Sequence, residues 1–177
     1  ANSFDGIPTT AKLFVLPNYM EYYDIEPWNR FEIKPLLIDY EEFYYEGNSY
    51  YTLIYNLNED YNSLRVKIGR ISGSPKTLDI PNSVYDFDVT IIENKAFYYS
   101  NSNVNTRTFE NLILPSTITH IGDSAFATYD SYYTMNLKGE LIIPNSVTYI
   151  GERAFYYCNK FTSLSFEENS NLETIGD

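Results

Sequence analysis

The chain repeats one short pattern three times, and this repetition limits its fold more than any other feature of the sequence. Each copy has a Leu-x-(Ile/Leu)-Pro tetrapeptide and, further on, an Ala-Phe pair whose aromatic members are Phe97, Phe126 and Phe155. These phenylalanines are 29 residues apart in both intervals. A pattern that recurs at a fixed period of this size is typical of stacked units. We therefore predict a solenoid that is mainly β, with short helices and turns.

About 3.5 units can be aligned over residues 78–177, the last of them truncated; they begin at Leu78, Leu112, Leu141 and Leu164. Pro144 is only 23 residues from its equivalent, Glu167, which predicts a basic unit of 23 residues. Six extra residues follow Phe97 and Phe126, and they are polar and rich in tyrosine. We expect them to form loops at one edge of the solenoid.

Each residue type within the unit has a physical explanation. The alternating apolar residues of the tetrapeptide predict a strand with one buried face, stacked on its neighbours at about 4.8 Å. Proline ends the strand because it lacks an N–H for the ladder. Gly122, Gly151 and Gly176 follow a second short strand, where we expect a turn conformation that glycine adopts easily. The phenylalanines should fill the space between layers as an aromatic spine.

Residues 141–158 carry the pattern most completely, from Leu-Ile-Ile-Pro through Ile150-Gly151 and Ala154-Phe155 to Cys158. This unit resembles that of the BspA-like leucine-rich repeat family of bacterial (Bacteroidetes-type) cell-surface proteins. The other copies depart from it, since Glu93 replaces the glycine of the first copy. The resemblance implies a leucine-rich-repeat solenoid of short stacked parallel strands.

Residues 1–77 lack the repeat. Residues 1–40 resemble the cap-like closing segment of many arrays in this family, with a strand ending at Pro17 and then a short helix. Residues 41–77 alternate strand and turn residues, which predicts a β hairpin or meander that starts the array. Two arrangements remain open: an end unit followed by a start unit in a fragment of a longer polypeptide, or one capping domain over residues 1–77.

Composition excludes several classes of function. The net charge is −12, so nucleic acid and anionic membranes are poor partners. The sequence has no apolar run of the length that spans a membrane, so we expect no membrane insertion. Its one cysteine excludes an internal disulfide and a thiolate zinc cluster. We interpret Cys158 as a small buried structural group.

The sequence offers no set of catalytic residues. His120 is the only histidine, and it occupies a slot that the other copies fill with Ile91, Tyr149 and Thr174, which indicates a surface side chain. Paired acids such as Glu41-Glu42 lack the spacing of a calcium loop. We therefore predict no enzyme, no catalytic or metal residue and no cofactor.

Two candidate binding surfaces remain. The first comprises the outward residues of the tetrapeptide strands, which are Asp79, Ile113, Ile142 and Ser165. We expect Ile113 and Ile142 to lie side by side and exposed, as at a contact site; the alternative is that they pack under a loop or only favour strand formation. The second comprises loop tyrosines, whose rings suit contact with protein or sugar but which can also cover the edge of the spine; they are Tyr98, Tyr99, Tyr129, Tyr132 and Tyr133.

These observations and the resemblance together predict a non-catalytic binding or adhesion module of a secreted or surface-attached bacterial protein. The resemblance implies an extracellular or cell-surface location. It also implies that the partners are host matrix or cell-surface proteins, glycans or other bacteria. The alternative is a structural spacer that has no ligand of its own.

Overall fold

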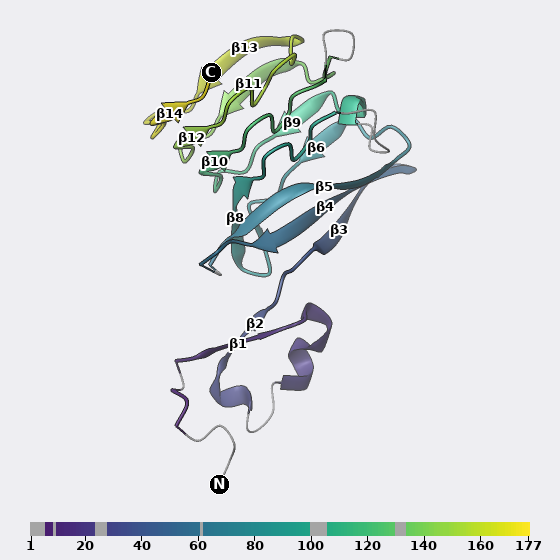
Figure 1. Ribbon diagram of the computed structural model, residues 1–177. Coiled ribbons are helices and arrows are strands. Elements are labelled where there is room, and N and C mark those ends of the chain that lie inside the picture. The colour runs from purple at the N-terminus through teal and green to yellow at the C-terminus, as the bar shows by residue number, and fades with distance from the viewer. Residues whose placement is uncertain (1–5, 9, 24–27, 61, 100–105, 130–133) are drawn as a thin grey trace. The chain divides into compact units, whose positions relative to one another are not determined.

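The computed structural model describes residues 6–8, 10–23, 28–60, 62–99, 106–129 and 134–177. The chain forms two compact units, residues 1–38 and residues 39–177 (Figure 1). Within the described residues, regular structure consists of β-strands and short 3-10 helices, without an α-helix. This confirms the predicted mainly-β class.

The first unit is built on one pair of short strands. β1 (Lys12–Val15) pairs in parallel with β2 (Glu32–Pro35), and the 3-10 helices η1 (Pro17–Tyr23) and η2 (Trp28–Arg30) lie between them in sequence. Pro17 ends the strand region and opens η1, where its missing N–H and fixed φ are tolerated. The predicted strand and short helix are therefore present. A small core of Val15, Phe31 and Leu37 is buried.

The second unit begins with an antiparallel meander, as predicted. Its strands are β3 (Tyr40–Glu46), β4 (Ser49–Leu57) and β5 (Leu64–Ser72). Tyr51, Leu53 and Tyr55 alternate along β4 and are almost wholly buried on one face of the meander. The Tyr51 hydroxyl donates to the Asp79 carbonyl and accepts from the Asp79 amide, both at 3.0 Å. The meander is thereby joined to the first repeat.

A long sheet continues from the meander through every repeat. β5 pairs in parallel with β8 (Phe87–Ile92), and the sheet continues through β10 (His120–Ile121), β12 (Tyr149–Ile150) and β14 (Thr174–Ile175) (Figure 1). β7 (Ser83–Val84) folds back on β8 in a tight hairpin. Its turn residues Tyr85 and Asp86 both have positive φ, 48° and 64°.

The tetrapeptide strands form the opposite side of the repeats. β6 (Thr77–Asp79) pairs with β9 (Asn111–Ile113), and β11 (Gly139–Ile143) pairs with β13 (Phe161–Phe166), all in parallel. The short 3-10 helix η3 (Thr106–Thr108) precedes β9.

The sequence predicted a continuous stack of these strands, but β9 and β11 belong to separate two-stranded sheets. The chain enters β11 through Gly139, whose φ of 81° turns the backbone there. The Lys138 amide still donates to the Glu110 carbonyl at 2.9 Å, but this hydrogen bond lies before the turn. The ladder is therefore not continued between β9 and β11, and we call this place the break.

The predicted aromatic spine is confirmed. Phe97 and Phe126 stack with ring centroids 5.1 Å apart and planes 4° apart. Phe126 and Phe155 stack at 5.2 Å and 7°. Phe97 and Phe126 are fully buried, so the spine fills the space between the long sheet and the tetrapeptide strands.

The interpretation of the repeat glycines as turn residues is wrong. Gly122, Gly151 and Gly176 are not among the residues with positive φ. They are required because successive repeats approach closely: a Cβ on Gly151 would lie 2.4 Å from Asp123 Oδ1 and 2.5 Å from the Asp123 amide nitrogen. The left-handed conformation occurs two residues later, and its residues are Lys95, Ser124 and Arg153, with φ of 58°, 53° and 55°.

Candidate binding surfaces

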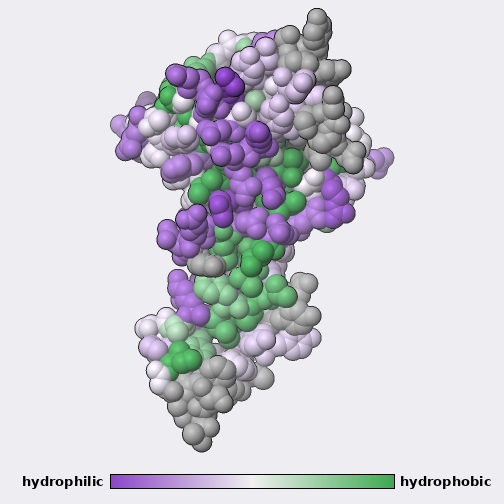
Figure 2. Space-filling view, viewed as in Figure 1, coloured by the Kyte–Doolittle hydropathy of each residue, from purple (hydrophilic) through white to green (hydrophobic). Residues whose placement is uncertain are grey.

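The tetrapeptide strands present a row of outward side chains. Asp79 pairs with Ile113 in the register of β6 and β9, and Ile142 pairs with Ser165 in the register of β11 and β13. Ile113 and Ile142 are 50% and 49% exposed. On the face seen in Figure 2, polar side chains cover much of the repeat region and smaller apolar areas lie between them. Both isoleucines thus leave about half of their surface open to solvent.

A cavity of about 270 Å³ lies at the break, and Ile113 and Ile142 both line it. Its other lining residues include the carboxylates Glu140 and Glu167. The Glu167 carboxylate accepts a hydrogen bond from the backbone amide of Asn145 at 3.0 Å, which fixes the position of the carboxylate. The break thus combines an apolar pair with negative charge, which suits a partner that offers an apolar group beside a cation.

Charged side chains bridge the same repeats at the start of these strands. Glu110 pairs with Lys76 at 2.7 Å and also with Lys138. These hydrogen bonds and positive charges lower the pKa of Glu110 to about 2. Lys76, Glu110 and Lys138 directly precede β6, β9 and β11, so this ionic bridge spans the break where the backbone ladder does not.

The loop tyrosines have different environments. Tyr129 is 68% exposed, whereas Tyr98 and Tyr99 are half-buried. Tyr99 forms a parallel β-bridge with Thr128, and the Arg107 guanidinium lies over its ring at 5.6 Å. Tyr132 and Tyr133 lie outside the described residues. Of the described candidates in these loops, Tyr129 has the most accessible ring.

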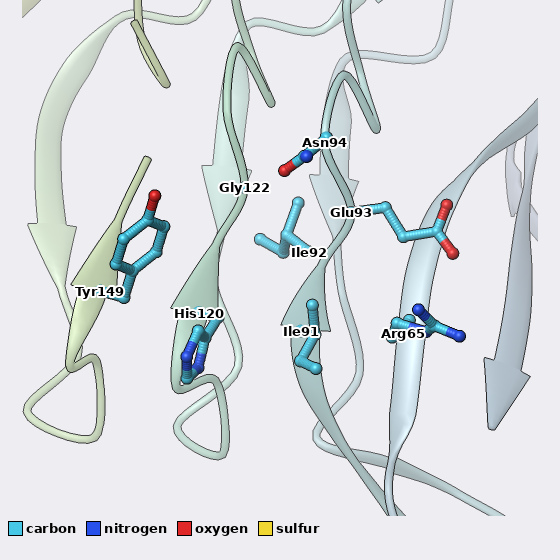
Figure 3. Close-up of a pocket in the computed structure, with 8 residues that line it drawn as sticks. All are labelled: Arg65, Ile91, Ile92, Glu93, Asn94, His120, Gly122 and Tyr149. Carbon is cyan, nitrogen blue, oxygen red and sulfur yellow. The ribbon is translucent and has the colours of Figure 1, made fainter. Parts of the chain in front are cut away.

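The outer face of the long sheet carries a third surface that the comparison of copies did not predict. One residue of each strand aligns with its neighbours across the sheet, and the row consists of Arg65, Ile91, His120, Tyr149 and Thr174. A cavity of about 430 Å³ lies over this row and is lined by its first four residues together with Ile92, Glu93, Asn94 and Gly122 (Figure 3). The variable slot that holds His120 in the alignment of the copies was the one sequence signal for this surface. Arg65 could not be found in that way, because it lies in the meander, outside the repeats.

The side chains at this cavity differ in their engagement. The rings of His120 and Tyr149 stack with centroids 5.7 Å apart and planes 28° apart. The Asn94 side-chain oxygen accepts from the Asp123 amide at 2.8 Å. The Arg65 guanidinium has no hydrogen bond or ion pair within the described structure, and its Nε is shut off from solvent. The cavity therefore joins an aromatic wall to an unpaired cation.

The titratable groups that were considered for catalysis have other roles. His120 Nδ1 lies 2.9 Å from the hydroxyl of Thr119, not beside a carboxylate. The Cys158 thiol donates to the Phe126 carbonyl at 3.3 Å, and desolvation raises its pKa to about 12. The residue is half-buried, not buried as the sequence predicted. Glu41 binds Arg70 and Thr52. Among the described residues, no three His, Cys, Asp or Glu are placed to hold a metal, and no helix is long and apolar enough to cross a membrane.

Comparisons with known proteins find the repeat in one part of the chain. Residues 128–177 match the model of a family described as BspA type leucine rich repeat region (6 copies). No curated protein matches the chain. Among solved structures, a leucine-rich repeat protein of T. pallidum is similar at 21% identity and a TM-score of 0.38. The similarity covers 62% of this chain and 66% of that one, just under two thirds of its length.

Proposed function

We propose that this chain, whose residues 128–177 form a BspA-type leucine-rich repeat region, is a non-catalytic protein-binding module of an extracellular or cell-surface protein. Leucine-rich repeat regions typically have no catalytic activity and generally bind proteins. The observation that carries the proposal is the pair of half-exposed isoleucines, Ile113 and Ile142, around one cavity at the break.

Two physical arguments support this surface as the contact. Apolar side chains gathered in a polar surface mark interaction sites more often than isolated ones do. Glu140 and Glu167 at the same cavity, together with a net charge of −12, favour a partner with lysine or arginine around an apolar group. Exposed matrix or cell-surface proteins that present such a segment are the proposed partners.

The test is binding of the purified chain to an array of matrix proteins, cell-surface proteins and glycans, with the double variant Ile113→Glu/Ile142→Glu beside it. Central contact residues each contribute more than about 1 kcal/mol, so we expect at least a tenfold loss of affinity in the variant. The matched control is Ile7→Glu/Leu16→Glu, which places the same charges on two exposed aliphatic residues of the first unit. A thermal melt checks the fold of both.

The results separate the alternatives. Protein binding that the Ile113→Glu/Ile142→Glu variant loses and the control retains supports the proposal. Equal binding by the variant and the wild-type chain would place the contact elsewhere. Absence of binding to every protein and glycan would favour a structural spacer.

A further inference from the structure

We propose that the cavity on the outer face of the long sheet is a second binding site, for a ligand that carries a carboxylate on a saturated sugar ring. The residues that would hold it are Arg65, Ile91, His120 and Tyr149. This site lies on a different sheet from the break and takes a different class of ligand, so it goes beyond the proposed protein contact.

Arg65 supplies the charge for this site. β5 carries three cations, and two of them are paired: Arg70 with Glu41, and Lys67 with Glu93 at 3.9 Å. In the described part of the chain, the Arg65 guanidinium has neither an ion pair nor a hydrogen bond, and its Nε is inaccessible to solvent. A guanidinium that is partly removed from water and has no partner loses hydrogen bonds and solvation. A bound carboxylate restores them, because the N–H donors of the guanidinium match the two carboxylate oxygens.

Glu93 is the acidic group that faces the same cavity. It is engaged by Lys67 at 3.9 Å, and the nearby Asp123 carboxylate accepts from the Tyr149 hydroxyl at 3.4 Å. Among the residues that line the cavity, the charged group without a partner in the described structure is therefore the Arg65 guanidinium, and this group favours an anion.

The opposite wall of the cavity suits a sugar ring. Arg65 and His120 lie on strands separated by β8, so they are about 10 Å apart at the usual spacing of strands, with Ile91 between them (Figure 3). One ring with its substituents fits this width. The aromatic and apolar side chains can pack against the C–H face of a sugar, while the side-chain nitrogen of Asn94 can donate to a sugar hydroxyl. The Asn94 side-chain oxygen and the Tyr149 hydroxyl already bond to Asp123.

The same geometry disfavours an acidic peptide. Extended peptides usually bind a sheet by adding a strand to a free edge. β8, β10 and β12 are each paired on both sides, so the backbone around the cavity offers no free edge. A ligand must be held by side chains alone, which is possible for a small ring with several hydroxyls.

The experiment uses the whole chain and follows its amide resonances by NMR during titration with glucuronate and N-acetylneuraminate. Glucose is the neutral probe, and a short glutamate-rich peptide is the acidic one. We expect at least one acidic sugar to bind tenfold more tightly than glucose, with shifts at Ile91, His120 and Tyr149. Arg65→Gln should abolish this preference, while Arg153→Gln, an exposed arginine that does not line the cavity, should keep it.

The outcomes are distinct. Tyr149→Ala should weaken the binding of every sugar. His120→Ala should leave the melting temperature unchanged, because the His120 side chain is exposed. Absence of binding by both acidic sugars would overturn the proposal, as would an unchanged preference in Arg65→Gln or equal binding of the peptide. The Ile113→Glu/Ile142→Glu variant should bind the sugar normally, so failure at the break and failure at this site can be told apart.

Discussion

The two sides of the repeat region differ although the same copies build both. The long sheet continues through every described repeat, whereas the tetrapeptide strands form two separate pairs. Residues are added on the path to the tetrapeptide strands: from Phe97 to Leu112 and from Phe126 to Leu141 there are 15 residues, but from Phe155 to Leu164 only 9. The longer paths precede both β9 and β11, and β9 still pairs with β6, so added length alone does not end the ladder. The break lies where the chain enters β11 through Gly139, whose φ is 81°.

This comparison shows how one repeat can combine regular packing with a distinctive surface. Where the copies keep their spacing, backbone pairing fixes the strands and leaves side chains alone to vary, as in the row from Arg65 to Thr174. At the break the ladder stops, and a cavity and an ionic bridge occupy the place. Three experiments examine this contrast.

Phe126→Ala should have the largest effect, because Phe126 stacks on both Phe97 and Phe155 and is fully buried. We expect a loss of about 3–5 kcal/mol in the free energy of unfolding. Both sides of the repeat region should fail together, as measured by urea unfolding. Tyr129→Ala is the matched control, since it removes a ring that is 68% exposed. A melt near that of the wild type would contradict the role of the spine.

Gly151→Ala should act mainly on the long sheet. A Cβ at this position meets the preceding repeat within 2.5 Å, and such overpacking costs about 1–3 kcal/mol. Amide hydrogen exchange should show the loss of protection in β10 and β12 more than in β6 and β9. Glu140→Ala, an exposed residue at the break, should change stability by less than about 0.5 kcal/mol. Uniform loss of protection on both sides would refute the idea that these glycines serve the long sheet.

Glu110→Gln should have the smallest effect and should depend on pH. The pKa of Glu110 is lowered from its usual value near 4.5 to about 2, so its contribution is complete above about pH 4.5 and is lost as the pH falls toward 2. The variant should therefore melt below the wild type at pH 7, and the difference should shrink at pH 3. Added salt should reduce it too, because the pairs are solvent-accessible. A difference that is independent of pH would exclude the ionic bridge as its cause.

The sequence correctly predicted the features that follow from a regular pattern of buried residues. The solenoid, the meander and the stacking of Phe97, Phe126 and Phe155 are confirmed, because repeated buried residues leave a clear pattern. The predicted role of the repeat glycines was wrong. Glycine is selected both where the backbone needs a positive φ and where two repeats approach closely, so the residue type alone does not tell these two requirements apart. The break was missed because loop length shows where residues are added but not whether a ladder survives.

The candidate sites were less accessible to sequence reasoning. Alignment of the copies placed His120 beside Tyr149, yet it could not place Arg65 there, because β5 belongs to no copy. The limits of residues 1–40 and 41–77 stay predictions, and so does the contact at Ile113 and Ile142. A surface made by side chains from different elements becomes visible only when the pairing of those elements is known.

The left-handed residues of the repeat have a consequence for thermostability. Lys95, Ser124 and Arg153 each hold a positive φ that is unfavourable for such side chains by about 1–2 kcal/mol. Asparagine tolerates this conformation better, and repeats in a solenoid contribute to stability nearly independently. Replacing all three by asparagine should therefore give a gain that grows with the number of repeats changed. The array thus holds, in three of its copies, a reserve of stability that one recurring substitution can release.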